Sequence, residues 1–125
     1  MSARVVHFEI PHDDAERARS FYREAFGWDV QSLPDMGYTI VSTGPAGDQG
    51  PTEPGYINGG MLQRSELSRA PVLTIAVEDI DAALTTVESH GGTTVRGRLP
   101  VGEMGFAAYF TDTEGNVMGL WENAP

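Results

Sequence analysis

The hydrophobic and polar positions of this chain change period early. Residues 4–10, RVVHFEI, alternate in the manner of a half-buried strand. Apolar residues then recur at helical spacing: Ala18, Phe21, Tyr22, Ala25 and Phe26. These positions predict a helix with one apolar face. Asp13, with Glu16 three residues later, fits a capping box at the start of this helix, and Gly27 fits its C-terminal cap.

The same order of elements then recurs. Three strand-like segments follow the first helix: WDVQSL, GYTIVST and, after a long loop, INGGML. PVLTIAV predicts the next strand, and Asp79 begins a second helix. Its apolar face is formed by four residues: Ile80, Ala83, Leu84 and Val87. Gly91 and Gly92 end this helix, and TTVRGRL, FAAYFTD and NVMGLWE predict three more strands.

The two halves also correspond residue by residue. His7 corresponds to Val72 and Asp14 to Asp79, and both pairs are 65 positions apart. This constant offset runs through the first strand and the first helix of each half. We therefore predict that the chain consists of two βαβββ modules, one after the other.

The later strands differ in spacing between the halves. Gly60 corresponds to Gly119, only 59 positions away, so the second half is shorter. The additional residues of the first half lie in 44–60, which is rich in glycine and proline and predicts a loop. A loop of this length is usually a lid or a disordered tip. The modules are then expected at about 4–63 and 71–123.

Alternation assigns two faces to the first strand of each module. One set should face the helices: Val6, Phe8, Ile10, Leu73, Ile75 and Val77. The other set should face away: Val5, His7, Glu9, Val72, Thr74 and Ala76. The second set is more polar than a core requires, which indicates a cavity on that face.

Composition and charge narrow the possible functions. The chain has 125 residues, the size of one domain, and 18 acidic against 8 basic residues, for a net charge of −10. All the basic residues are arginine, which excludes a Schiff-base lysine and a P-loop lysine. The absence of cysteine excludes disulfides and thiol nucleophiles. An acidic surface disfavours nucleic acid and attracts cationic small molecules.

No membrane or export signal is visible in the pattern. No apolar run approaches the roughly 20 residues that a membrane span needs. The first residues, MSARVVHFEIP, lack the basic stretch and apolar block of a signal peptide. We therefore expect a cytoplasmic protein without membrane contacts.

Three segments carry a family resemblance: HFEIPHDDAERARSFYREAFGW, LTIAVEDIDAALTTVESHGG and FTDTEGNVMGLWE. They resemble the vicinal oxygen chelate superfamily, which includes glyoxalase I, extradiol dioxygenases, fosfomycin resistance enzymes and bleomycin resistance proteins. The resemblance covers nearly the whole chain and implies a single domain over residues 1–125. Its fold would be α+β, with two tandem βαβββ modules forming a cupped, barrel-like mixed sheet and the helices outside. It also implies a homodimer, because members usually cover open sheet edges by pairing two chains.

The resemblance also names the positions at which members that use a metal hold it. Two are on the first strands, here His7 and Val72, and two are on the last strands, here Gly60 and Gly119. Of these four residues, only His7 has a side chain that can coordinate a metal, whereas a catalytic divalent ion generally needs about three protein ligands. We expect no metal and no other cofactor. The alternative is a rearranged site that uses His7, Glu9 and a third ligand.

His7 and Glu9 are the candidate catalytic pair, because one strand face places them close enough for general acid–base work. The alternative is that His7 only shapes the pocket. Candidate ligand-binding residues surround the space left by the glycines: Tyr38, Met61, Thr74, Phe106, Tyr109 and Trp121. Aromatic groups around such a space suit a flat or cationic ligand, although core packing or a dimer interface would also explain them. His12 and His90 are expected to be exposed.

Two functions from different classes follow. The first is a metal-independent small-molecule-binding protein similar to bleomycin resistance proteins, with a flat or cationic ligand. The alternative is an enzyme, a metal-dependent glyoxalase-like lyase, isomerase or dioxygenase. A third possibility is an interaction module without a ligand cavity. The residues favour binding over catalysis, but they do not identify the ligand.

Overall fold

The computed structural model describes residues 2–48 and 50–125, so Met1 and Gln49, the latter inside the predicted loop 44–60, lie outside the described residues. The chain divides into a first unit, His7–Pro71, and a second unit, Val72–Pro125 together with residues 2–6. The sequence pattern placed residues 4–6 in the first module. The carbonyl of Arg4 instead accepts a hydrogen bond from the Ala76 amide at 2.9 Å, which explains why the start of the chain belongs to the second unit.

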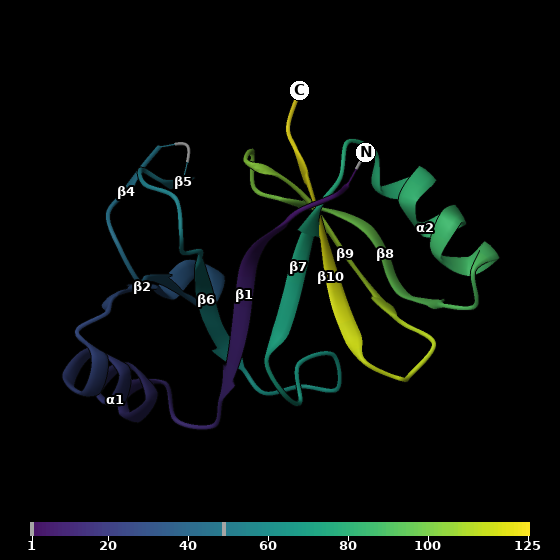
Figure 1. Cartoon of the computed structure of the whole chain (residues 1–125). Helices are drawn as coiled ribbons and strands as arrows, with labels where there is room; N and C mark the ends of the chain where they lie inside the picture. The colour runs from purple at the N-terminus through teal and green to yellow at the C-terminus, as the bar shows by residue number, and fades with distance from the viewer. Residues whose placement is uncertain (1, 49) are drawn as a thin grey trace. The chain divides into compact units, whose positions relative to one another are not determined.

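The predicted α+β class with a repeated βαβββ order is confirmed (Figure 1). Along the first half run β1 (Val5–His12), α1 (Ala15–Phe26), β2 (Asp29–Leu33), the short 3-10 helix η1 (Pro34–Met36), β3 (Tyr38–Ser42), β4 (Ala46–Gly47), β5 (Gly50–Pro51) and β6 (Asn58–Gln63). Along the second half run β7 (Val72–Ala76), α2 (Ile80–Ser89), β8 (Thr93–Val101), β9 (Gly105–Thr111) and β10 (Val117–Asn123). β4 and β5 pair with each other inside the predicted loop.

The strands of the two halves have the same connectivity. In the first unit the order is β2-β3-β6-β1, and in the second it is β8-β9-β10-β7. The last strand of each module runs parallel to the first one, and the remaining pairs are antiparallel. Glu9 lies opposite Gly60, and Thr74 lies opposite Gly119. Both glycines therefore occupy the same place in their sheets, which confirms the internal repeat.

The ends of α1 follow from local chemistry. The Asp14 side chain accepts a hydrogen bond from the Arg17 amide at 3.0 Å and caps the helix. The predicted capping box of Asp13 and Glu16 is therefore wrong by one position. Gly27 closes the helix with a φ of 71°, a left-handed conformation that glycine adopts without strain, as predicted.

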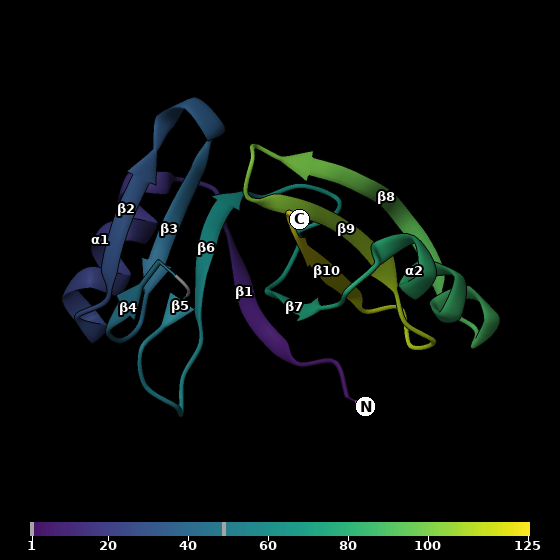
Figure 2. The same cartoon turned by 90° about the horizontal axis from the view of Figure 1, so that it is seen from above.

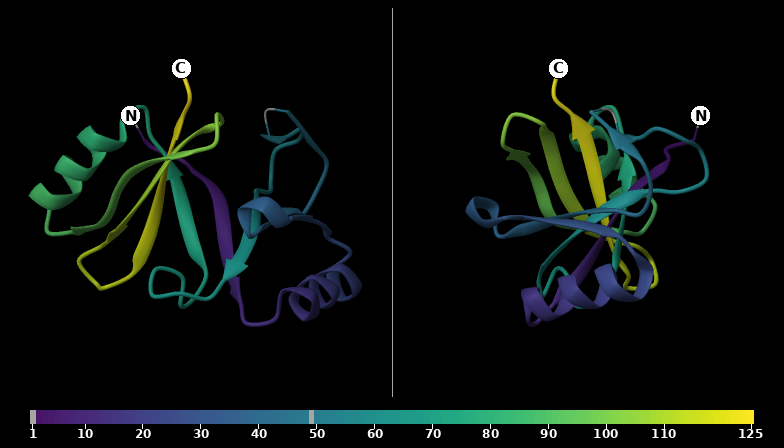
Figure 3. Two further views of the ribbon diagram at one scale, coloured as in Figure 1. Left: turned by 180° about the vertical axis from the view of Figure 1, so that it is seen from behind. Right: turned by 90° about the vertical axis from the view of Figure 1, so that its left-hand side faces the viewer.

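α1 packs loosely against the sheet of the first unit, where it contacts β2 and β6 and lies beside β2 (Figures 2 and 3). The core consists of three buried residues and the partly buried ones around them: Val30, Val41, Met61, Phe8, Ile10, Ala18, Tyr22 and Trp28. Trp28 stacks on Tyr22 with the ring centroids 4.8 Å apart. Phe21 and Phe26, predicted on the apolar face of this helix, are 58% and 63% exposed. The helix therefore rests on Ala18 and Tyr22.

α2 packs more deeply on the second unit, beside β8 and β9 (Figure 1). Ile80 and Leu84 are buried, with Ala83 and Val87 packed around them, which confirms the predicted apolar face. The rest of the buried core comes from β9 and β10: Ala108, Phe110 and Leu120. Neither helix in the described part of the chain is long or apolar enough to cross a membrane.

Candidate functional site

β1 presents alternate residues to its two faces. Phe8 and Ile10 pack in the core, so His7 and Glu9 lie on the opposite face, as predicted. Tyr38, the first residue of β3, lies between them. Its hydroxyl is 2.8 Å from His7 Nε2 and donates to Glu9 Oε2 at 3.2 Å. The phenol thus bridges the imidazole and the carboxylate.

The chemistry of the three groups sets the direction of these hydrogen bonds. A carboxylate only accepts hydrogen bonds, so the hydroxyl hydrogen of Tyr38 is directed at Glu9. The hydroxyl oxygen then accepts from Nε2–H of His7. Donation runs from His7 through Tyr38 to Glu9, and a neutral His7 keeps its lone pair on Nδ1.

Burial controls the charge of His7. Desolvation lowers the pKa of His7 below its usual value, and attraction to Glu9 offsets only part of this effect. The imidazole is therefore neutral near pH 7. A neutral imidazole beside a carboxylate can exchange a proton with a ligand or hold a ligand by hydrogen bonds.

Side chains that carry hydroxyl groups fill the space above both glycines of the repeat. A Cβ atom at Gly60 would overlap the Tyr38 hydroxyl and ring. In the second unit, a Cβ atom at Gly119 would lie 2.8 Å from Thr74 Oγ1. Neither position therefore has room for the carboxylate that the resemblance places there.

The donor set does not fit a divalent metal ion. Of the positions that the resemblance names, His7 alone has a ligand, and Val72 is only 2% exposed. Among the residues that the structure describes, no group of three or more His, Asp and Glu side chains could hold a metal ion. A third ligand for the rearranged site with His7 and Glu9 is thus not found among these residues.

In the second unit, the predicted residues Thr74, Tyr109 and Trp121 share one face. Thr74 and Tyr109 both lie opposite Gly119, and Trp121 follows that glycine by two positions on β10. Trp121 also lies over Gly105, where a Cβ atom would be 2.6 Å from the indole ring, and its Nε1–H donates to Asn123 Oδ1 at 2.8 Å. This face therefore carries two aromatic rings and a buried hydroxyl.

Two predicted ligand-binding residues lie on the helix-bearing faces. Met61 is fully buried in the core of the first unit, one residue past Gly60 and so on the other side of β6. Phe106 packs against the core of the second unit, with the Arg98 guanidinium 3.6 Å above its ring. Each residue therefore lies on the face of its sheet opposite to Gly60 or Gly119, because a strand directs adjacent residues to opposite faces.

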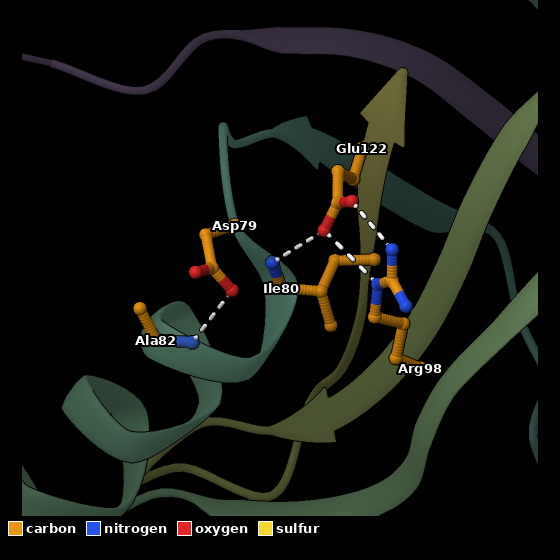
Figure 4. Close-up of polar contacts among 5 residues, drawn as sticks. All are labelled: Asp79, Ile80, Ala82, Arg98 and Glu122. Carbon is orange, nitrogen blue, oxygen red and sulfur yellow. Dashed lines mark hydrogen bonds and ion pairs between the residues drawn. The ribbon is translucent and has the colours of Figure 1, made fainter. Parts of the chain in front are cut away.

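A clamp at the start of α2 was not predicted (Figure 4). Glu122 accepts a hydrogen bond from the Ile80 amide at 2.9 Å and forms a two-pronged ion pair with Arg98, at 2.9 and 3.2 Å. Asp79 caps the same helix by accepting from the Ala82 amide at 3.1 Å. The hydrogen bond from Arg98, followed by the one from Ile80, lowers the pKa of Glu122. Glu122 lies three positions past Gly119 on β10, so it points away from the face of that glycine.

His12 also differs from expectation. His90 is exposed as predicted, but His12 is only 8% exposed. The reason is that β1 continues to His12 and does not end at Ile10. His12 thus follows Phe8 and Ile10 on the helix-bearing face.

Sequence comparisons find similarity to bleomycin resistance protein-like and glyoxylase-like proteins. A family model described as bleomycin resistance protein-like N-terminal matches residues 4–44. A glyoxylase-like domain-containing protein of Didymella fabae is 32% identical over 127 residues, covering 96% of this chain and 94% of that protein. CFP32 of Mycobacterium bovis, which is named as a glyoxylase, is 29% identical over 91% of this chain. The match spans 43% of CFP32, less than half the length of that relative.

Solved structures share the fold. Protein BH1468 from Bacillus halodurans superimposes with a TM-score of 0.67 at 17% identity, covering 100% of this chain and 97% of that one. A variant of Streptomyces coelicolor methylmalonyl-CoA epimerase, in complex with 2-nitronate-propionyl-CoA, has a TM-score of 0.66 at 16% identity, covering 100% of both chains. At these identities the likeness concerns the fold alone.

Proposed function

The chain belongs to the vicinal oxygen chelate superfamily, and on that premise we propose that it binds a flat or cationic small molecule without a catalytic metal. The observation that carries the proposal is the group formed by His7, Tyr38 and Glu9. In this group a phenol lies where the resemblance places a metal-binding carboxylate. The group offers hydrogen bonds and one negative charge on the face of β1 opposite to Phe8 and Ile10.

Charge favours a cationic ligand over an anionic one. The chain carries a net charge of −10, which attracts cations at long range. At short range, Glu9 is the only formal charge in the group when His7 is neutral. Within the first unit, the ring of Tyr38 beside Glu9 is a suitable surface for a flat cation.

Binding of two dyes tests this proposal. Proflavine is a flat cation, and fluorescein is a flat anion of comparable shape. We expect proflavine to bind with one-to-one stoichiometry and fluorescein not to bind. Glu9→Gln should weaken proflavine binding by about tenfold, the cost of one charged hydrogen bond, whereas Glu24→Gln on α1 should not. Equal binding of both dyes, or equal effects of both variants, would contradict the proposal.

Native mass spectrometry of freshly purified protein provides an independent approach. A small molecule that remains bound through purification would appear as a constant mass increment. We expect this increment to disappear in Tyr38→Phe, which removes the bridging hydroxyl, and to persist in Tyr22→Phe, which removes a hydroxyl from the helix-bearing side. An increment that persists in both variants would place the ligand elsewhere.

A second candidate function is proton transfer by an enzyme of the lyase or isomerase type. The hydrogen-bond chain from His7 to Glu9 favours it, because neutral His7 can take up a proton while Glu9 orients Tyr38. Incorporation of deuterium from D2O into methylmalonyl-CoA provides a direct assay. His7→Gln should reduce turnover by about 10² to 10⁴, and His90→Gln should not change it. Exchange at the uncatalysed rate in the unaltered protein would remove this candidate.

A further inference from the structure

Asn58 lies beside His7 on the face of the first sheet that also carries Glu9. β1 and β6 run parallel, and their register pairs His7 with Asn58 and Glu9 with Gly60 (Figure 1). A strand returns to the same face every second residue, so Asn58 shares the face of Gly60. Neighbouring strands are about 4.8 Å apart. A single small group can therefore contact the side chains of His7 and Asn58 together.

A backbone contact fixes the orientation of the Asn58 amide. Its Oδ1 accepts a hydrogen bond from the backbone N–H of Thr43 at 2.8 Å. The Thr43 hydroxyl lies 3.5 Å from the same oxygen and donates to the carbonyl of Ile57 at 2.9 Å. Because a backbone N–H only donates, the atom that faces Thr43 has to be the amide oxygen. The NH2 group is therefore on the side of the amide that is turned away from Thr43.

The NH2 group of Asn58 keeps both of its donors for a ligand. Among the described residues, only the oxygen of this amide has a hydrogen-bond partner. Asn58 is half-buried, yet the side-chain atoms of the described residues that are sealed from water without a partner are His12 Nδ1 and Ser68 Oγ. Nδ2 of Asn58 is thus reachable from solution.

His7 adds an acceptor next to these donors. Its Nε2 is 2.8 Å from the Tyr38 hydroxyl, whereas Nδ1 has no partner within the part of the chain that the structure describes. Nδ1 is not one of the two sealed atoms, so it is also reachable from solution. Since Nε2–H donates to Tyr38, the lone pair of the neutral ring lies on Nδ1. An acceptor and a pair of donors therefore lie on neighbouring strands of one face.

An amide edge, in which an N–H and a C=O point in the same direction, is complementary to this pair of groups. We propose that the ligand carries such an edge, as lactams and primary carboxamides do, with its N–H on His7 Nδ1 and its carbonyl oxygen on Asn58 Nδ2. Glu9 lies two residues further along β1, about 6.6 Å away, so a cationic group of the ligand belongs at that distance from the edge. This inference rests on the proposed function and narrows its ligand class.

Two flat lactams test the proposal on the unaltered chain. Isocarbostyril has the amide edge, and N-methylisocarbostyril keeps the rings and the carbonyl but lacks the N–H. Each is titrated into the isotope-labelled chain, and the side-chain NH2 signals of Asn58 are followed by NMR. We expect isocarbostyril to shift these signals and to bind at least about tenfold more tightly than its methyl derivative, which leaves the His7 acceptor unpaired.

The same spectra contain an internal control. The NH2 signals of Asn116, which donates to Asp112 Oδ2 at 3.0 Å, should stay in place. Equal affinities for the two lactams, or binding without a shift at Asn58, would overturn the proposal.

A variant separates ligand binding by Asn58 from its contact with Thr43. Asn58→Asp keeps an oxygen for the Thr43 amide but removes both N–H donors, so it should weaken isocarbostyril binding by about tenfold or more. Asn123→Asp makes the same change in charge on β10 and should bind like the unaltered chain. Equal affinities in the two variants would overturn the proposal. If Asn58→Asp does not fold, the comparison of the two lactams on the unaltered chain decides.

Proflavine binding, measured on the same protein, distinguishes failure of this inference from failure of the proposed function. If the unaltered chain binds proflavine but binds both lactams equally, the amide edge is wrong and the proposed function stands. If the chain prefers isocarbostyril but does not bind proflavine, the amide edge stands and the cationic ligand is wrong.

Discussion

Gly60 and Tyr38 depend on each other. The Tyr38 ring lies directly over Gly60, and its hydroxyl contacts both His7 and Glu9. Any side chain at position 60 would have to push the ring out of this arrangement. The absence of a side chain at this position is thus part of the candidate functional site.

A substitution at Gly60 tests this dependence. We expect Gly60→Ala to lower the free energy of unfolding by about 1 to 3 kcal/mol, the usual cost of overpacking, because Tyr38 must move. Gly97→Ala in β8 is the matched control, since a Cβ atom there would meet nothing within 4 Å. Urea denaturation measures both variants. Similar midpoints for the two would show that Tyr38 does not need the space above Gly60.

The lowered pKa of His7 predicts a pH dependence of stability. Because the folded-state pKa lies below the usual value of 6.5, the unfolded chain binds this proton more readily. The stability associated with neutral His7 is thus fully present above pH 6.5 and is lost as the pH falls through the folded-state pKa. Urea midpoints measured between pH 8 and pH 5 should fall less in His7→Gln than in the unaltered chain. His90→Gln, which alters an exposed histidine, should keep the original slope, and equal slopes in all three proteins would contradict the prediction.

At the residue scale, the sequence predicted faces better than contacts. Alternation placed His7, Glu9 and Thr74 correctly because each lies on a regular strand. The bridging position of Tyr38 depends on the pairing of β3 with β6, which lies outside the reach of a local pattern. Met61 was assigned to the same region as Gly60, although adjacent residues of a strand face opposite sides.

At the scale of elements, the clamp on α2 links three segments. Glu122 from β10 and Arg98 from β8 meet at the first turn of α2, and Arg98 also covers the ring of Phe106 on β9. The clamp therefore joins the helix to the sheet at its N-terminus. Phe106 thus lies between the core of the second unit and the Arg98 guanidinium.

A substitution in this clamp has a pH-dependent consequence. Glu122→Gln should lower the thermal midpoint at pH 7, because it removes the charge that faces Arg98 and weakens the contact with Ile80. The pKa of Glu122 is lower in the folded chain than in the unfolded chain. Its carboxylate therefore stabilises the fold fully above the unfolded-state pKa, and this stabilisation is lost as the pH falls through the folded-state pKa. The difference from the unaltered chain should therefore shrink in acid. The control is Glu103→Gln, at an exposed position. A decrease in its thermal midpoint as large as that of Glu122→Gln would contradict the role of the clamp.

Element order was predictable because hydrophobic period and turn residues act locally. The residues at which the elements begin and end were less predictable. Two adjacent acids, Asp13 and Asp14, can each cap a helix, and only the structure distinguishes them. β1 runs past Pro11 to His12, although a proline usually marks the end of a strand, and this extension buries a histidine that was expected at the surface.

At the scale of the whole molecule, the strand order ends at β2 in the first unit and at β8 in the second. Open strand edges of this kind are usually covered in native proteins. We predict a homodimer, which sedimentation equilibrium at micromolar concentration should show as twice the mass of the chain. A monomer under these conditions would contradict the prediction.

The repeat also extends to the positions where the resemblance places metal ligands. Two modules of one design place equivalent residues in equivalent positions, and in both of them a glycine beneath a hydroxyl group lies where the resemblance places a carboxylate. The sequence alone shows that these positions carry no ligand side chain. The filling of the vacated space by Tyr38 and Thr74 depends on strand register, so it is visible only in the structure.

Metal analysis tests the central claim most directly. Purified chain is dialysed to equilibrium against zinc, nickel, cobalt and manganese salts in turn, and the metal that remains with the protein is measured by mass spectrometry. The account predicts far less than one ion per chain for each metal, with no difference between the unaltered protein and His7→Ala. One ion per chain that is lost in His7→Ala would contradict it.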